Sequence, residues 1–138
     1  MNEIFVDTSA WDAIEDANDA NHEIALLFKE EIAEKYRLVT TCYVLDETYT
    51  LLLLNIGYVR TVKFKRNIDV MAELGILTVV HISESIERAA WEIFERFNID
   101  KKWSFTDCTS KIVMEQRNIY EVFAFDHHFE QMGFVRKP

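Results

Sequence analysis

The N-terminal stretch Ile4-Phe5-Val6-Asp7 is a run of three apolar residues that ends in an acid. A strand buried on both faces has such an uninterrupted apolar run, because neither face meets water. A similar run, Val122-Phe123-Ala124-Phe125, stands near the other end of the chain and is followed by Asp126. If the two strands are parallel neighbours, about 5 Å apart, their acids meet at one rim of the sheet. The alternative for each acid is an ordinary helix cap or turn.

The segments between these two runs alternate between helical and strand-like patterns. Apolar spacing predicts helices over residues 9–17, 21–36, 43–56, 59–74 and 106–117, and another that Ser83 caps and that includes residues 86–97. Gly57 and Gly75 are placed to end two of these helices. Further strands are expected at residues 38–40, 76–82 and 134–135. This alternation predicts an α/β fold with a largely parallel sheet, in which ligands gather at the carboxyl ends of the strands.

Composition limits the class of protein. The chain has 138 residues, 49% of them hydrophobic, with only three glycines and one proline, so we expect one domain spanning 1–138 with long helices. Its net charge of −9 argues against a protein that coats nucleic acid, but not against a nuclease with an acidic site. The chain has two separate cysteines, an acidic N-terminus and no apolar run long enough to cross a bilayer. These features predict a cytoplasmic protein without a membrane segment.

Glu47 is an acid in an apolar context. In a helix over 43–56 its neighbours at helical spacing are Val44, Leu51 and Leu54, so we expect its carboxylate to be drawn toward the apolar face. An unpaired buried carboxylate costs several kcal/mol. Glu47 therefore either reaches an arginine, or extends to the surface, or serves as a cleft acid or metal ligand. The neighbours of Asp46 at helical spacing are Tyr49, Thr50 and Leu53, which do not form an apolar face, so they do not indicate a buried position for this acid.

Asp107 belongs to Ser104-Phe105-Thr106-Asp107, which fits a capping box at a helix start. That explanation is structural, but the same position aims an acid at the ends of the strands.

Four acids meeting at one rim would repel one another unless a cation neutralised them. All-oxygen ligands suit Mg²⁺ or Mn²⁺, and such sites carry out phosphoryl and phosphodiester chemistry.

Four segments, in this order along nearly the whole chain, resemble the motifs of the PIN-domain family and, within it, the VapC-type toxin ribonucleases of type II toxin–antitoxin pairs. They are Phe5-Val6-Asp7-Thr8-Ser9-Ala10-Trp11, Leu45-Asp46-Glu47-Thr48, Ser104-Phe105-Thr106-Asp107-Cys108 and Ala124-Phe125-Asp126-His127-His128-Phe129. Each motif is modest alone, whereas four in order are specific.

The resemblance implies a three-layer α/β/α sandwich around a central, mainly parallel sheet. It implies a Mg²⁺- or Mn²⁺-dependent endoribonuclease that leaves a 5′-phosphate and a 3′-hydroxyl, acts as a homodimer, and is blocked by a small cognate antitoxin protein. The residues that it assigns to catalysis and metal binding are Asp7, Glu47, Asp107 and Asp126, with Thr8 or Ser9 holding a water or a phosphate oxygen.

Positive charge for an RNA substrate is scarce. The candidates for RNA contacts are Arg60, Lys63, Lys65, Arg66, Lys101 and Lys102, of which the first four are equally well explained as a solvated helix face. His127-His128 invites a transition-metal interpretation, but adjacent histidines need not point the same way, and we expect a surface turn.

Two other functions remain open at this point. A housekeeping PIN-like RNA-processing nuclease without an antitoxin fits the same residues, and a small neighbouring gene for a DNA-binding protein would favour the toxin. A receiver-type signalling domain shares the length and fold class, but its pattern requires an acceptor Asp after the third strand and a Lys after the last. Here the third strand leads into His81-Ile82-Ser83 rather than an aspartate, and Asp126 stands where the pattern offers no partner lysine.

Overall fold

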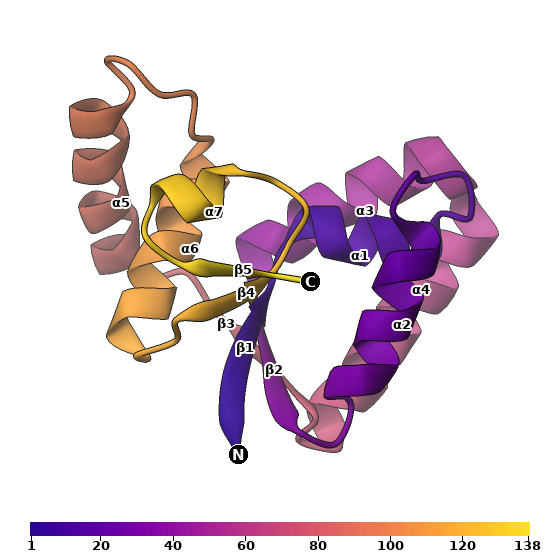
Figure 1. Ribbon diagram of the computed structural model, residues 1–138. Coiled ribbons are helices and arrows are strands. Elements are labelled where there is room, and N and C mark those ends of the chain that lie inside the picture. Colours follow the sequence, from indigo (N-terminus) through magenta and orange to yellow (C-terminus); the bar gives the residue numbers. More distant parts are fainter.

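A five-stranded parallel sheet, in the order β3-β2-β1-β4-β5, forms the centre of the molecule (Figure 1). The computed structural model describes all residues, 1–138. Its strands are β1 (Asn2–Val6), β2 (Tyr36–Thr41), β3 (Leu77–Val80), β4 (Glu121–Phe123) and β5 (Val135–Lys137). Phe5 of β1 is in register with Val122 of β4, so the two apolar runs are parallel neighbours, as the sequence predicts.

Seven helices cover the sheet. They are α1 (Thr8–Glu15), α2 (His22–Ile32), α3 (Cys42–Ile56), α4 (Tyr58–Glu73), α5 (Glu84–Phe97), α6 (Phe105–Gln116) and α7 (His128–Gln131). Figure 1 shows α2 and α4 on one side of the strands and α5, α6 and α7 on the other. The molecule is therefore the expected three-layer α/β/α sandwich. No helix is long and apolar enough to cross a membrane.

The core lies along β1 and β4. Ile4, Phe5 and Val6 are at most 1% exposed, which confirms that β1 is buried on both faces. The ring of Phe123 in β4 packs edge-on against Phe28 of α2, with centroids 4.7 Å apart. Burial of this apolar surface fixes β1 and β4 side by side, and thereby fixes where the residues that follow them lie.

Several element ends differ from the prediction. The helix predicted over 21–36 ends at Ile32, and the chain has already entered β2 at Tyr36. The strand predicted over 122–125 is Glu121–Phe123, because the backbone N–H of Phe125 donates to the Ser9 hydroxyl (3.0 Å) instead of to a strand. Asp126 therefore stands three residues beyond β4, in a loop. Gly57 and Gly75 take positive φ angles of 87° and 74° after α3 and α4, as the sequence predicts.

Candidate metal centre

A polar pocket of about 350 Å³ opens at the carboxyl ends of β1 and β4, where parallel sheets bind their ligands. All four predicted acids line it. Six acids and one lysine lie on its wall: Asp7, Asp12, Asp19, Glu47, Asp107, Asp126 and Lys102. The structure thus brings together residues that are up to 119 positions apart in the chain.

Asp7 begins α1 as its N-cap and is 5% exposed. Its Oδ2 accepts hydrogen bonds from the backbone N–H of Ser9 (3.2 Å) and from the Ser9 hydroxyl (2.9 Å). The same hydroxyl accepts from the N–H of Phe125 (3.0 Å). Ser9 therefore fixes the Asp7 carboxylate and also ties the start of α1 to the loop that carries Asp126.

The pocket disfavours negative charge in the absence of a cation. Burial, and next the negative charge of Asp107, raise the pKa of Asp7 to about 7, although the Ser9 donors oppose the rise. The pKa of Glu47 is also raised, first by burial and then by Asp107, while Thr106 opposes the rise by donating a hydrogen bond. Both shifts have the same physical causes, because partial loss of hydration and a neighbouring negative charge each destabilise a carboxylate anion unless a positive charge joins it.

Glu47 reaches the pocket for a different reason from the one expected. The buried face of α3 consists of Val44, Leu45, Thr48 and Leu52, and Glu47 is on the exposed face with Leu54, which is 78% exposed. The prediction that Glu47 lies on the core side is therefore wrong. The face of α3 that carries Glu47 borders the pocket, whereas the opposite face packs into the core. Its carboxylate still lines the pocket, where it is close enough to Asp107 for their charges to interact.

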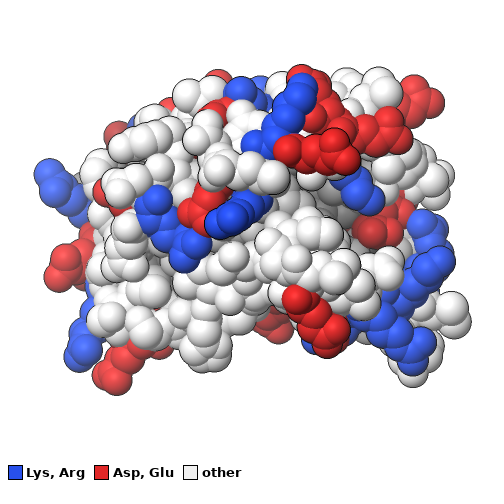
Figure 2. All heavy atoms as spheres, turned by 90° about the horizontal axis from the view of Figure 1, so that it is seen from below, with Lys and Arg blue, Asp and Glu red and all other residues white.

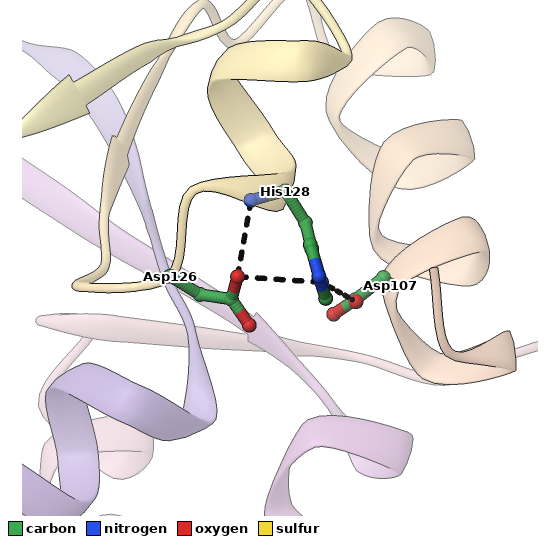
Figure 3. Close-up of side chains that lie close together, drawn as sticks. All are labelled: Asp107, Asp126 and His128. Carbon is green, nitrogen blue, oxygen red and sulfur yellow. Dashed lines mark hydrogen bonds and ion pairs between the residues drawn. The ribbon is translucent and has the colours of Figure 1, made fainter. Parts of the chain in front are cut away.

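Asp107 and Asp126 are joined through His128 (Figure 3). Asp107 closes the predicted capping box with Ser104, whose N–H donates to its Oδ2 (3.2 Å). His128 Nδ1 lies 2.9 Å from the same Oδ2 and 3.3 Å from Asp126 Oδ1. The backbone N–H of His128 also donates to Asp126 Oδ1 (3.0 Å). The expectation of a surface turn holds for His127, whose side chain is 78% exposed, but not for His128.

The donor set fits a hard divalent cation. Carboxylate oxygens dominate the pocket wall, and ligand atoms of Asp107, Asp126 and His128 lie within 4.8 Å of one another. Oxygen-rich sites of this kind suit Mg²⁺ or Mn²⁺ better than the thiolate and imidazole sets that zinc prefers. Both cysteines are outside this pocket, so neither contributes a sulfur ligand to it, and burial raises the pKa of the Cys108 thiol to about 11.

Of the predicted RNA contacts, only Lys102 lines the pocket. Arg60 donates to the carbonyl of Glu15, Lys65 pairs with Asp69, and Lys101 lies 3.8 Å from Asp100. Lys63 and Arg66 are exposed on α4, away from the pocket wall. On the end of the molecule that is lowest in Figure 1, basic and acidic side chains are interspersed (Figure 2).

The two hydroxyls of the Asp7 motif already have partners in the protein. The Thr8 hydroxyl bonds to the Val44 carbonyl and to Thr48 (both 3.4 Å), so it faces α3 in the core. The Ser9 hydroxyl is shared between Asp7 and Phe125. Thr8 and Ser9 thus position the start of α1, and contact of either with a water or phosphate remains a prediction.

Sequence reasoning missed Asp12 and the inward position of His128. Asp12 is 9% exposed, accepts from Asn55 (3.2 Å), and has a pKa raised chiefly by burial. Its signal in the sequence was an acid between the apolar pairs Ala10-Trp11 and Ala13-Ile14. For His128, no local pattern shows that the short helix α7 turns the ring back toward α6.

The comparisons with known proteins agree with this geometry. The family model for the PIN domain matches residues 4–135. The chain is 38% identical over 136 residues to the 23S rRNA-specific endonuclease VapC20 of Mycobacterium tuberculosis, covering 96% of this chain and 95% of that protein. It is 25% identical to a VapC ribonuclease of Archaeoglobus fulgidus, covering 90% and 77%.

A solved structure gives the same result in three dimensions. The crystal structure of Mycobacterium tuberculosis VapC20, described there as a sarcin–ricin loop cleaving toxin, aligns with a TM-score of 0.81 and 36% identity over 96% of each chain. The sheet order, the placement of the acids and these matches all point to one family. This protein belongs to the PIN-domain family and, within it, to the VapC-type ribonucleases.

Proposed function

We propose that this chain is a Mg²⁺- or Mn²⁺-dependent endoribonuclease and the toxin of a toxin–antitoxin pair. The observation that carries the proposal is the convergence of Asp7, Glu47, Asp107 and Asp126 on one pocket whose wall has a single lysine. Burial, and next the repulsion from Asp107, raise the pKa of Asp7 and of Glu47, and a bound divalent cation would offset both effects by stabilising the carboxylate anions.

For the substrate, we infer 23S ribosomal RNA and, within it, the sarcin–ricin loop. The support is the relative that is named for this RNA and 38% identical over 96% of the chain, together with the solved structure described by this loop. A single structured loop also suits an acidic protein. Such a loop is recognised by shape and by splayed bases, so it needs fewer phosphate contacts than general RNA binding. Because the inferred substrate is ribosomal RNA, we also propose a cytoplasmic location.

The chain's own residues would divide the work as follows. Asp7, Glu47, Asp107 and Asp126 would hold the cation, which supplies activation of a water and neutralisation of charge at the scissile phosphate. Ser9 keeps Asp7 in a fixed orientation, because its N–H and its hydroxyl both donate to Oδ2. Lys102, exposed on the pocket wall, is placed to contact a phosphate of the bound RNA. Hydrolysis leaves a 5′-phosphate and a 3′-hydroxyl.

The remaining predicted RNA contacts are more distant from the pocket. We assign Lys101, beside Lys102, to the RNA backbone near the cleavage point. Arg60, Lys63, Lys65 and Arg66 of α4 would contact the backbone only of an RNA that extends beyond the pocket. Their weight in binding is therefore expected to be smaller than that of Lys102.

We further propose a homodimer and an antitoxin partner. An antitoxin that covers an acidic pocket would bring basic side chains into it, because an acidic cover would add to the repulsion. For the dimer, the protein offers large exposed apolar side chains, among them Leu54 (78% exposed), Leu27 (69%) and Trp91 (51%).

The test is cleavage of cellular RNA by the purified, antitoxin-free protein. Wild type and Asp7→Asn would be compared on intact ribosomes and total RNA with Mg²⁺, Mn²⁺ or EDTA, and the 5′ ends of the products sequenced. We expect one dominant metal-dependent cut in the sarcin–ricin loop, made only by the wild type, and growth arrest on expression. Metal-dependent cuts in precursor RNAs without growth arrest would instead show a housekeeping nuclease, and equal cutting in EDTA would refute the metal-dependent mechanism.

A further inference from the structure

His128 is the one side chain that contacts two of the pocket's acids at once. Its Nδ1 lies 2.9 Å from Asp107 Oδ2 and 3.3 Å from Asp126 Oδ1, and its backbone N–H donates to Asp126 Oδ1 (3.0 Å). The ring points from α7 toward the first turn of α6 (Figure 3). The neighbouring histidine, His127, contacts neither acid and reaches Glu130 instead.

The two acids come from different elements, whose flanking segments are also joined by the indole N–H of Trp103 donating to Gln131 Oε1 (2.8 Å), a bond that touches neither acid. Asp107 is in the first turn of α6, and Asp126 is in the loop after β4. Ser104 holds Asp107 within its own helix, but that bond does not fix the distance to Asp126. His128 connects the two carboxylates themselves, because its side chain donates toward Asp107 in α6 while its backbone N–H holds Asp126 in the loop.

The chemistry of the ring indicates how it acts. A nitrogen that donates its N–H to a carboxylate has no lone pair left for a cation. Nδ1 is the ring nitrogen that faces both acids, and it is engaged with their oxygens. Hydrogen-bond partners that orient metal-binding carboxylates typically change metal affinity by about 10- to 100-fold when they are removed.

We propose that His128 is a positioning residue of the metal centre: its Nδ1–H and its backbone N–H hold Asp107 and Asp126 in the orientation in which they bind the divalent cation. This inference rests on the proposed function. It assigns the histidine no direct bond to the cation and no contact with the RNA.

The experiment measures Mn²⁺ binding without RNA, from the EPR signal of free Mn²⁺ during titration of the protein. His128→Phe keeps a ring of similar size but removes the donor, and we expect it to weaken Mn²⁺ binding about 10- to 100-fold. His128→Asn places an amide nitrogen on Cγ, where Nδ1 was, and should restore an affinity close to that of the wild type. His127→Phe is the matched control and should leave the affinity unchanged.

A second readout separates positioning from direct ligation. With Mn²⁺ bound to the wild type, pulsed EPR should show no coupling to a histidine nitrogen. In cleavage assays, His128→Phe should raise the Mn²⁺ concentration for half-maximal rate, while KM for the RNA at saturating Mn²⁺ stays unchanged. Thermal unfolding of each variant checks the fold, and His128→Ala removes the donor without added bulk if Phe disturbs α7.

The outcomes distinguish this inference from the proposed function. Wild-type Mn²⁺ affinity in a folded His128→Phe or His128→Ala protein would overturn the positioning role alone, provided that the wild type still cleaves RNA with metal. A nitrogen coupling to Mn²⁺ would also overturn it, by making His128 a ligand. Failure of the wild type to bind Mn²⁺ and to cleave RNA would overturn the proposed function, and the positioning role with it.

Discussion

The two sides of the acidic pocket are held by different kinds of contact. On the β1–α1 side, Asp7 is fixed by Ser9, only two residues further along the chain. On the α6–α7 side, Asp107 is fixed to Asp126 by His128, 21 residues away from Asp107. The first arrangement forms whenever the helix start forms, whereas the second depends on the chain returning past β4. On the β1–α1 side we therefore expect substitution of Asp7 itself to have the largest effect on activity. On the α6–α7 side we expect activity to be more sensitive to substitution of the connecting residue, His128.

The largest expected effect is loss of cleavage in Asp7→Asn. Asn remains a good N-cap, so α1 should still form, but a neutral amide gives a cation no negative charge. We expect the single-turnover rate constant of cleavage to fall about 1,000-fold, which corresponds to roughly 4 kcal/mol of transition-state stabilisation. The measurement is single-turnover cleavage of a sarcin–ricin loop RNA, with Asp46→Asn on the exposed part of α3 as the control. Cleavage by Asp7→Asn within a few-fold of wild type would remove Asp7 from the site.

The same substitution should stabilise the metal-free protein at alkaline pH. Unfolded Asp7 loses its proton near 3.8 and folded Asp7 near 7, so the unfolded state binds fewer protons between these values. Stability from this group therefore falls as the pH rises from about 4 to about 7. Asp7→Asn removes this loss, worth at most about 4–5 kcal/mol at about 1.4 kcal/mol per pKa unit. Urea unfolding in EDTA at pH 5 and pH 8 measures it, and a gain that does not grow with pH would contradict the assigned cause.

Ser9→Ala tests the local side of the comparison. The change removes the donor to Asp7 and the acceptor for the Phe125 N–H, so Asp7 and the Asp126 loop lose one shared link. We expect metal-dependent cleavage to fall about 10- to 100-fold, and the free energy of unfolding to fall by about 1–2 kcal/mol. Thr50→Ala is the control, because that exposed hydroxyl bonds only to a carbonyl of its own helix. Equal metal affinity and rate in Ser9→Ala would show that the backbone N–H of Ser9 is sufficient.

Lys102→Gln is expected to give a smaller effect, on RNA binding rather than on chemistry. Loss of one phosphate contact should weaken binding several-fold and lower the salt dependence of log K by about one unit. Lys63→Gln on α4, which is outside the pocket, should change neither quantity for a short sarcin–ricin loop RNA. A larger effect at Lys63 than at Lys102 would move the RNA path onto α4.

The contrast between local and long-range contacts also explains which residues of the pocket could be placed from the sequence. Asp7 and Asp107 are each set by a local signal, an acid after an apolar strand and a capping box, and both were placed correctly. Glu47 was placed in the pocket for the wrong reason, because helical spacing locates a residue on a face but does not say which neighbour covers that face. Asp126 lies at the predicted rim although β4 ends earlier than predicted. The earlier end could not be predicted, because the Ser9–Phe125 hydrogen bond found where β4 ends joins residues 116 positions apart.

Contacts made only by tertiary packing were not visible in the sequence. His128 depends on the packing of α7 against α6, and no local spacing encodes the 2.9 Å contact with Asp107. Asp12 was missed because a single acid among apolar residues is as consistent with a buried hydrogen bond as with a binding pocket. The resemblance of four ordered motifs supplied the family, but it gave the acids and not the residues that hold them.

The most direct test of the metal centre is an anomalous difference map from a crystal of this protein grown with Mn²⁺. We expect a peak in the pocket, in contact with carboxylate oxygens of Asp7 and Asp107, with His128 still bonded to Asp107. Crystals of Asp7→Asn grown in the same way should show this peak weakened or lost. No peak in the pocket of the wild type at saturating Mn²⁺, or a peak held elsewhere on the chain, would contradict the account.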